Sequence, residues 1–279
     1  MRCLFLRIFT LCLALCTCTA CQTTTPYSMD TDSLFSEDFS SSISDSTKTE
    51  SDIWQVQDVD VSRVNPDYKL VALTFDDAPS PTLERLISVF ASFNENNPDC
   101  PAYATLFCNG IRIRNASLHA LASAYSLGWE LGNHGYSHND FTTMTEQEIQ
   151  QEMQSTDSLL NNVDRQDKHL FRPPFGNLQN ETKRRLDVPI MYWTVDTLDW
   201  TGIESTTIKR TVMHSIRDGD IILLHDGYEQ TVQAVKQLLP ALKENGYQAV
   251  TLSQMAKVHQ CNLYNGGAYI RIRKPKALR

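Results

Sequence analysis

Short apolar runs alternate along this chain with segments whose apolar residues recur at helical spacing. Strands that alternate with helices in this way favour a parallel sheet with helices packed against it. The predicted strands lie near 70–75, 103–108, 128–133, 169–172, 189–195, 220–225 and 247–251. The pattern therefore predicts one α/β domain with seven parallel strands.

Two local signals concern the helices between these strands. Thr145 and Glu148 have the spacing of a capping box, and apolar residues follow at helical spacing from Ile149. Pro240 lies inside a helical pattern over residues 231–245 and lacks the N–H that a helix interior uses. We expect one helix to begin at the first signal and another to kink or split at the second.

The first 21 residues have the pattern of a secretory leader. Two arginines precede an apolar stretch that is too short for a membrane span, and small residues follow. Thr19-Ala20-Cys21 resembles the cleavage site of a bacterial lipoprotein, with Cys21 as the lipidated residue; an ordinary cleaved leader is the alternative. We expect an exported protein at the bacterial cell surface, held to the outer face of the membrane by a lipid anchor or otherwise secreted.

The composition of the remaining chain predicts a linker, a folded domain and a C-terminal tail. Residues 22–66 are rich in Ser, Thr and Asp and predict a disordered linker, because they offer little apolar surface to bury. Nine acidic residues and one Lys between 22 and 60 equal the whole formal net charge of −8, so the charges of all other residues of the chain sum to zero. Without a basic face, nucleic acid is excluded as a partner. Residues 259–279 are expected to form a basic C-terminal tail.

Five of the predicted strands are followed at once by polar residues. These segments are Thr74-Phe75-Asp76-Asp77, Asn133-His134-Gly135-Tyr136-Ser137-His138, Arg172-Pro173-Pro174-Phe175-Gly176, Asp196-Thr197-Leu198-Asp199-Trp200 and Leu223-Leu224-His225. In a parallel α/β barrel the carboxyl ends of all strands face one way, and that face carries the chemistry. We therefore expect these segments to converge.

Two imidazoles and a carboxylate form a common ligand set for a divalent transition metal. His134 and His138 are four residues apart, which on a helical turn places them on one face. Asp76 and Asp77 point in opposite directions on an extended strand, so one can bind metal while the other acts on water. The same set could hold iron for oxygen chemistry, but an additional base and acid suit hydrolysis better.

The segments TFDDAP, HGYSH, RPPFG, DTLDW and LLH occur in this order between residues 70 and 252. They resemble the five motifs of the polysaccharide deacetylase family, also known as the NodB homology domain or carbohydrate esterase family 4. The resemblance implies a distorted (β/α)7 barrel as a single catalytic domain. Ala78 stands where the family usually has Gly, a change that costs about 1 kcal/mol if the position needs a positive φ.

The resemblance also implies a role for individual residues. Asp77, His134 and His138 would bind the metal, most readily zinc, with cobalt or another transition metal possible. Asp76 would act as general base and His225 as general acid.

Further residues would support this chemistry. By resemblance, Asp196 pairs with His225 and raises its pKa, and Arg172 holds Asp76 ionised. The backbone N–H of Phe175 would stabilise the oxyanion. Trp200 and Leu223 would line a pocket for the acetyl methyl group, although burial in the core would explain both equally well.

Other reactive side chains have no predicted role in the site. Asp199 could bond nearby backbone, and we expect structural or exposed positions for His119, His169, His214 and His259. Outside the leader the cysteines are Cys100, Cys108 and Cys261, of which an exported domain could pair two.

These features favour hydrolysis of N-acetyl groups on a polymeric amino sugar, with peptidoglycan N-acetylglucosamine as the first substrate. Chitin oligomers, exopolysaccharide amino sugars and O-acetyl xylan are alternatives. A metal hydrolase of small cyclic amides and a non-catalytic lipoprotein that binds wall glycans are the rival functions.

Overall fold

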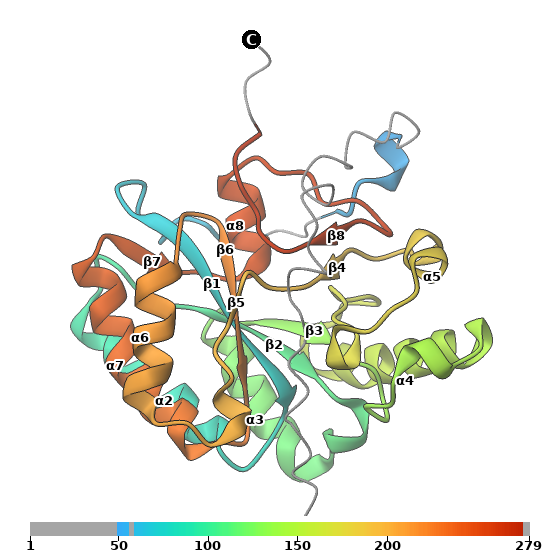
Figure 1. Cartoon of the computed structure of the whole chain (residues 1–279), viewed down its shortest axis with the longest axis horizontal. Coiled ribbons are helices and arrows are strands. Elements are labelled where there is room, and N and C mark those ends of the chain that lie inside the picture. The colour runs from blue at the N-terminus through green and yellow to red at the C-terminus, as the bar shows by residue number, and fades with distance from the viewer. Residues whose placement is uncertain (1–48, 56–58, 276–279) are drawn as a thin grey trace, which may run out of the picture. The chain divides into compact units, whose positions relative to one another are not determined.

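The computed structural model describes residues 49–55 and 59–275 (Figure 1). These residues belong to one compact unit, Ser46–Arg279. The predictions of a leader at 1–21, of lipidation at Cys21 and of a linker up to residue 48 lie outside the described residues. Within the described part of the chain, no helix is long and apolar enough to cross a membrane.

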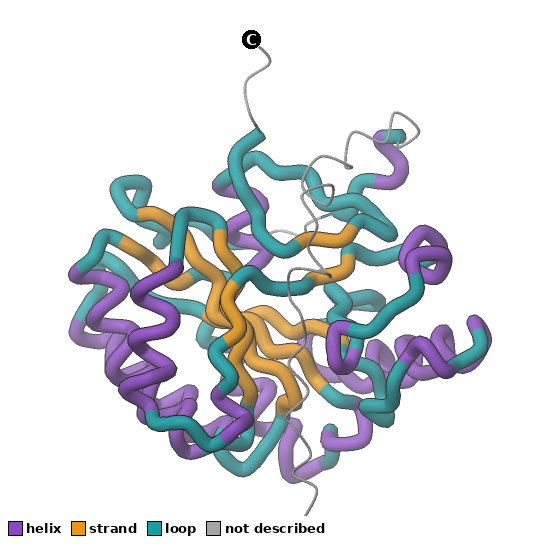
Figure 2. Tube along the Cα trace, in the orientation of Figure 1, coloured by secondary structure: helices purple, strands orange, loops and turns teal. Residues whose placement is uncertain are grey.

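A parallel sheet runs through the centre of the fold (Figure 2). β1 (Lys69–Ala78) pairs with β2 (Ala104–Cys108), β6 (Asp220–His225) and β7 (Tyr247–Ala249). β3 (Glu130–Asn133) adds to β2, and β5 (Val195–Asp196) adds to β6. Because all these ladders are parallel, the carboxyl ends of the strands lie at one edge of the sheet. The predicted parallel α/β fold is confirmed.

The predicted strand near 169–172 contributes only single bridges. Phe171 bridges Asn133 on one side and Ile190 on the other. The strand predicted at 189–195 is divided into β4 (Ile190–Met191) and β5, and β4 pairs with β8 (Ala268–Tyr269), which was not predicted. The ladders between the named strands thus form an open path from β3 to β5, and the bridges at Phe171 link β3 to β4.

Helices connect the strands and cover the sheet. They are α2 (Leu83–Asn96), α3 (Asn115–Ser126), α4 (Glu146–Asp164), α5 (Asn180–Arg185), α6 (Ser205–Ser215), α7 (Glu229–Glu244) and α8 (Leu252–Val258). Short 3₁₀ turns are η2 (Glu50–Asp52), η3 (Gly110–Arg112), η4 (Phe141–Thr143), η5 (Pro174–Gly176) and η6 (Asp199–Thr201). In Figure 1, α2, α6 and α7 lie together at the left of the sheet, and α4 and α5 lie at the right.

Side chains of β1 alternate between two apolar cores. Val71 and Leu73 pack into a core shared with α2, α3, α6 and α7. Leu70 and Ala72 face a second core, to which α8 contributes. Because residues two apart on a strand share a face, Asp76 lies on the same face as Leu70 and Ala72. The strand therefore delivers a carboxylate to the rim of the second core.

The structure corrects two predicted boundaries. In the predicted linker, the N–H of Trp54 donates to the carbonyl of Leu263 at 2.7 Å, and its side chain packs against the second core. In the predicted tail, Tyr269 and Ile272 are buried and β8 pairs with β4. The fold therefore extends beyond residues 67–258 on both sides. The average composition of these segments did not reveal their few apolar residues.

One of the two local helix signals was confirmed, and the split predicted at the other was wrong. The capping box of Thr145 and Glu148 starts α4 as predicted. α7 continues through Pro240 and is not split there.

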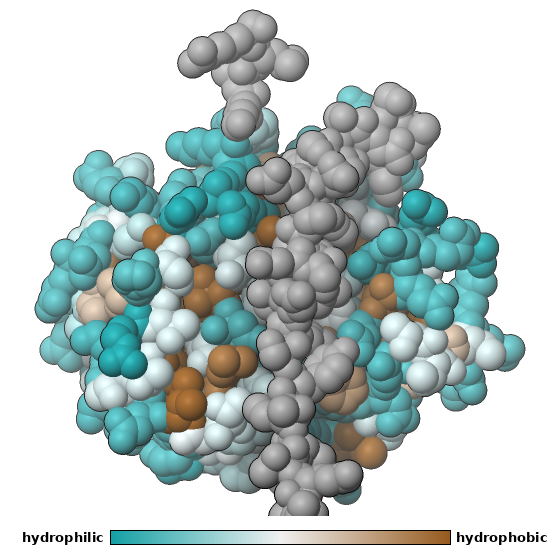
Figure 3. Space-filling view, in the orientation of Figure 1, coloured by the Kyte–Doolittle hydropathy of each residue, from teal (hydrophilic) through white to brown (hydrophobic). Residues whose placement is uncertain are grey.

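Cys100, Cys108 and Cys261 are all free thiols, so no two of them are paired. On the face shown in Figure 3, apolar colour is confined to separate spots on a largely hydrophilic surface.

Candidate active site

Asp76 and Asp77 stand at the carboxyl end of β1, where the strand becomes irregular. The register of β1 with β2 shifts between Phe75 and Ala78, and Asp77 has a φ of 66°. This left-handed residue turns the chain, so the two carboxylates point to different partners. Ala78 has no positive φ, and the strain considered for an alanine at this position is not present.

Two side chains from the loop after β2 hold Asp77. Asn109 Nδ2 donates to Asp77 Oδ1 at 2.7 Å, and Arg112 Nη1 donates to the backbone carbonyl of Asp77 at 3.2 Å. Burial by itself raises the pKa of Asp77, but the neighbouring His134, His138 and Arg112 outweigh burial and hold that pKa below its usual range. Asp77 is therefore ionised at neutral pH.

His134 and His138 approach the same carboxylate from a loop. Gly135 has a φ of 73° and His138 a φ of 59°, so the predicted helical turn is wrong. His134 Nδ1 lies 2.7 Å from the carbonyl oxygen of Arg172, which can only accept, so the ring donates there and its Nε2 keeps a lone pair. Burial lowers the pKa of His134, which favours the neutral ring that a metal ligand requires.

These side chains fit a divalent metal ion. One donor atom from each of Asp77, His134 and His138 lies within 4.8 Å of the others. His138 Nε2 is 3.4 Å from Asp77 Oδ1, and the centroids of the two imidazoles are 5.2 Å apart. Three protein ligands that leave further positions open are typical of catalytic zinc sites. The structure thus brings together the three residues that the sequence predicted.

Arg172 binds Asp76 beside this cluster. Its guanidinium is fully buried, and Nη1 donates to Asp76 Oδ1 at 2.7 Å and to Thr74 Oγ1 at 2.8 Å. Carbonyl oxygens of Met191 and Tyr192 accept the Nε–H and one Nη2–H at 2.9 and 3.0 Å. Because four hydrogen bonds hold the guanidinium, the predicted contact between Arg172 and Asp76 has a defined geometry.

The carboxylate that holds His225 is Asp199, so the predicted pairing with Asp196 is wrong. His225 Nδ1 lies 2.8 Å from Asp199 Oδ1, and Asp199 Oδ2 accepts the backbone N–H of His225 at 2.8 Å. Asp196 instead accepts the N–H of Leu198 at 2.9 Å. Leu198 has a φ of 54°, and this turn directs Asp199 back towards β6.

Opposing influences act on the protonation of His225. Burial by itself lowers the pKa of His225, but the hydrogen bond and charge of Asp199 and the charges of Asp76 and Asp77 outweigh burial and raise that pKa. Asp76 and His225 are register partners on β1 and β6. A carboxyl and an imidazole therefore lie side by side at the strand ends, next to the cluster of metal donors.

Comparisons with known proteins assign this arrangement to a family. The family model described as polysaccharide deacetylase matches residues 63–188. A bifunctional xylanase/deacetylase from Pseudobutyrivibrio xylanivorans is 33% identical over 197 residues, covering 70% of this chain and 31% of the relative. The peptidoglycan-N-acetylmuramic acid deacetylase PdaC of Bacillus subtilis is 31% identical over 196 residues, covering 70% of this chain and 40% of the relative. The chain thus spans less than half the length of these two proteins.

Other relatives are matched over most of their length. A peptidoglycan-N-acetylglucosamine deacetylase of Bacillus cereus is 32% identical over 192 residues, covering 66% of this chain and 67% of the relative. The Xyl-CE4 domain of a xylanase from the hindgut metagenome of Trinervitermes trinervoides has a TM-score of 0.68 at 31% identity, covering 73% of this chain and 98% of the domain. This chain belongs to the polysaccharide deacetylase family.

A further family structure was solved with a metal ion. It is a family 4 acetyl xylan esterase from Clostridium thermocellum in complex with cobalt. Its TM-score is 0.65 at 25% identity, and the match covers 75% of this chain and 100% of that one.

In this member of the polysaccharide deacetylase family, apolar side chains surround the site. Phe175 is 51% exposed, and its ring centroid lies 4.7 Å from that of His138. Trp200 is 52% exposed and follows Asp199 in η6. Leu223 is 4% exposed and shares the inner face of β6 with His225, two residues away. Phe175 and Trp200 thus lie at the surface, and Leu223 is buried on the same strand as His225.

Proposed function

We propose that this chain is a metal-dependent hydrolase that removes N-acetyl groups from a polymeric amino sugar, with peptidoglycan N-acetylglucosamine as the substrate. The observation that carries the proposal is the cluster of Asp77, His134 and His138 donors, flanked by Asp76 and by His225. Relatives named as peptidoglycan deacetylases support this substrate. The xylanase/deacetylase relative makes O-acetyl xylan the competing one.

We propose zinc as the metal, with cobalt as a substitute. Asp77, His134 and His138 would hold the ion, and the cobalt in the related acetyl xylan esterase supports a divalent transition metal. When bound, such an ion polarises a carbonyl and lowers the pKa of water. The side chains described below supply the proton transfers.

Asp76 is suited to take the proton of the attacking water. Arg172 fixes one of its oxygens, and the other lies 3.6 Å from His134 Nε2, which directs it towards the metal donors. As the water oxygen bonds to the carbonyl carbon, the proton moves to Asp76. The hydrogen bond from the neighbouring guanidinium orients Asp76 for this step.

His225 is suited to protonate the leaving nitrogen. Its Nδ1 is bound to Asp199, which leaves Nε2 for the substrate. The raised pKa favours the protonated ring that this step needs. As the C–N bond breaks, Nε2 gives its proton to the sugar nitrogen, and the products are acetate and a free amine.

The apolar side chains around the site provide for the sugar and the acetyl group. We propose that Trp200 and Leu223 line the pocket for the acetyl methyl and that the Phe175 N–H binds the developing oxyanion. An exposed tryptophan also offers a face on which a sugar ring can pack. Export by the leader, with lipidation of Cys21, would place this site next to wall glycans.

The test measures acetate released by the full chain from chitin tetraose, purified peptidoglycan and acetylated xylan, with zinc or cobalt. We expect release from the two amino-sugar substrates, and loss of most turnover in Asp76→Asn and His225→Ala. Release from xylan alone would contradict the proposed substrate. Glycan binding without acetate release would favour the non-catalytic alternative, and opening of cyclic amides alone would favour that hydrolase class.

A further inference from the structure

His169 is a buried histidine between two carboxylates of α4. Its Nδ1 lies 2.8 Å from Asp157 Oδ1, and its Nε2 lies 3.0 Å from Asp164 Oδ2. Carboxylate oxygens only accept hydrogen bonds, so this geometry requires a proton on both ring nitrogens. Burial by itself lowers the pKa of His169, but the two hydrogen bonds outweigh burial and raise the pKa to about 9. A cation therefore sits between two anions in the interior.

The same carboxylate extends this triad to the end of β3. Asp157 Oδ1 also accepts Asn133 Nδ2 at 2.8 Å, and Asn133 Oδ1 accepts the backbone N–H of Gly135 at 2.9 Å. Asn133 is fully buried, and its Nδ2 donates as well to the carbonyl of Met153 on α4 at 2.9 Å. Each polar atom of the Asn133 side chain is thus engaged one residue before the proposed ligand His134.

A second carboxylate of α4 binds the next part of this loop. Glu152 Oε2 accepts the backbone N–H groups of Tyr136 and Ser137, each at 2.7 Å. Together with Gly135, three consecutive N–H groups between the two metal-binding histidines donate to side chains. Gly135 is also confined, because a Cβ there would approach the Phe141 ring to 3.1 Å.

We propose that Asp157, His169 and Asp164 form a positioning triad that, through Asn133, sets the loop that carries His134 and His138. The proposal rests on the metal site proposed above and does not depend on which glycan is the substrate. Without the imidazolium, two carboxylates of α4 would repel each other and Asp157 would turn away from Asn133. The Gly135 peptide would then lose its acceptor, and the spacing of the two imidazoles would relax. Partners outside the ligand set typically change metal affinity 10- to 100-fold.

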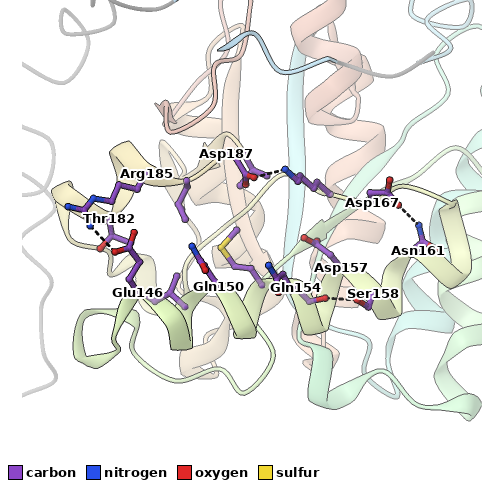
Figure 4. Close-up of a pocket in the computed structure, with 15 residues that line it drawn as sticks. Glu146, Gln150, Gln154, Asp157, Ser158, Asn161, Asp167, Thr182, Arg185 and Asp187 are labelled. Atoms are coloured by element: carbon purple, nitrogen blue, oxygen red, sulfur yellow. Dashed lines mark hydrogen bonds and ion pairs between the residues drawn. The ribbon is translucent and has the colours of Figure 1, made fainter. Parts of the chain in front are cut away.

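One member of the triad borders open space. Asp157 lines a cavity of about 490 Å³ over α4, next to the segments 167–168 and 182–188. Figure 4 shows Asp157 between Gln154 and Ser158 on the helix, among the side chains that border this cavity. A rearranged side chain at Asp157 can therefore reach water.

The experiment titrates zinc into the metal-stripped full chain by calorimetry at neutral pH. We compare wild type with His169→Phe, which removes both N–H groups, and His169→Gln, which retains a donor. Glu130→Ala is the control. Glu130 lies at the opposite end of β3 and binds Thr105 at 2.8 Å, so its loss weakens packing without touching the loop. Urea unfolding of the metal-free chains reports the stability of each variant.

We expect zinc to bind His169→Phe about 10- to 100-fold more weakly than wild type, with partial recovery in His169→Gln. Glu130→Ala should be less stable, yet bind zinc within about threefold of wild type. Wild-type affinity in a folded His169→Phe, or an equal loss in Glu130→Ala, would overturn the proposal. If the phenylalanine variant does not fold, wild-type affinity in His169→Gln would overturn it. A wild-type chain that binds no zinc would instead remove the proposed metal site.

Discussion

Replacement of Asp199 by Asn should change how acetate release depends on pH. Asp199 is fully buried and binds both the ring and the backbone N–H of His225 at 2.8 Å. An amide in its place puts an N–H against one of these donors and removes the negative charge. With fewer anions near the ring to oppose the effect of burial, the pKa of His225 falls. The ring therefore loses its proton at lower pH than in wild type.

The size of the effect follows from the lost hydrogen bond. A hydrogen bond to a charged group contributes about 1.5–3 kcal/mol. If Asp199 stabilises the protonated ring by this amount, its loss reduces kcat/KM about 10- to 100-fold at alkaline pH, where the ring is mostly deprotonated in both proteins. The loss should shrink at lower pH, where His225 is protonated in both proteins.

The assay is acetate release from chitin tetraose between pH 5 and 10 by wild type, Asp199→Asn and Asp196→Asn. The second variant is a matched control, because Asp196 binds the N–H of Leu198 rather than His225. The alkaline limb should move to lower pH in Asp199→Asn and much less in Asp196→Asn. A larger displacement in the Asp196 variant would refute the assignment of Asp199 as the partner of His225.

Four other changes have defined outcomes. Chelation should abolish acetate release, and added zinc should restore it. Asn109→Ala removes the hydrogen bond to Asp77 Oδ1 and should weaken zinc binding about tenfold in calorimetry. Unchanged affinity would exclude this role of Asn109. Arg172→Met leaves Asp76 buried without its cationic partner, so urea unfolding should show a free energy of unfolding that is about 3–5 kcal/mol lower than in wild type. A decrease of less than about 1 kcal/mol would contradict the argument from burial. Removal of residues 259–279 takes Leu263, Tyr269 and Ile272 from the core and should lower the free energy of unfolding by about 5–9 kcal/mol. Circular dichroism should then show no cooperative unfolding. A transition like that of wild type would mean that these residues are a tail outside the fold, as the sequence predicted.

The sequence predicted the convergence of the site because the carboxyl ends of parallel strands share one edge. Asp76, Asp77 and His225 each follow an apolar strand run, and their meeting needs only the correct order of strands. His134 and His138 also converge, although a loop and not a helical turn brings them together. Strand placement was therefore enough to find the donors, while the local backbone between them was not predictable from spacing.

The errors arise where a single backbone angle or side-chain contact decides. Asp196 and Asp199 follow the same strand, and only the positive φ of Leu198 selects Asp199 as the partner of His225. Asn109 directly follows a predicted strand, the same signal that marked the other segments, but it was not singled out. The ion triad of His169 has no sequence signature, because Asp157 and Asp164 meet that histidine only through tertiary packing.

Anomalous diffraction at the zinc absorption edge, from crystals of the full chain grown with zinc, would show directly whether one ion joins the strand ends. We expect a single strong peak bound by Asp77, His134 and His138, with Asp76 and His225 facing its open side. A peak at other residues, or no peak in crystals that diffract well, would contradict the proposed metal site and the mechanism built on it.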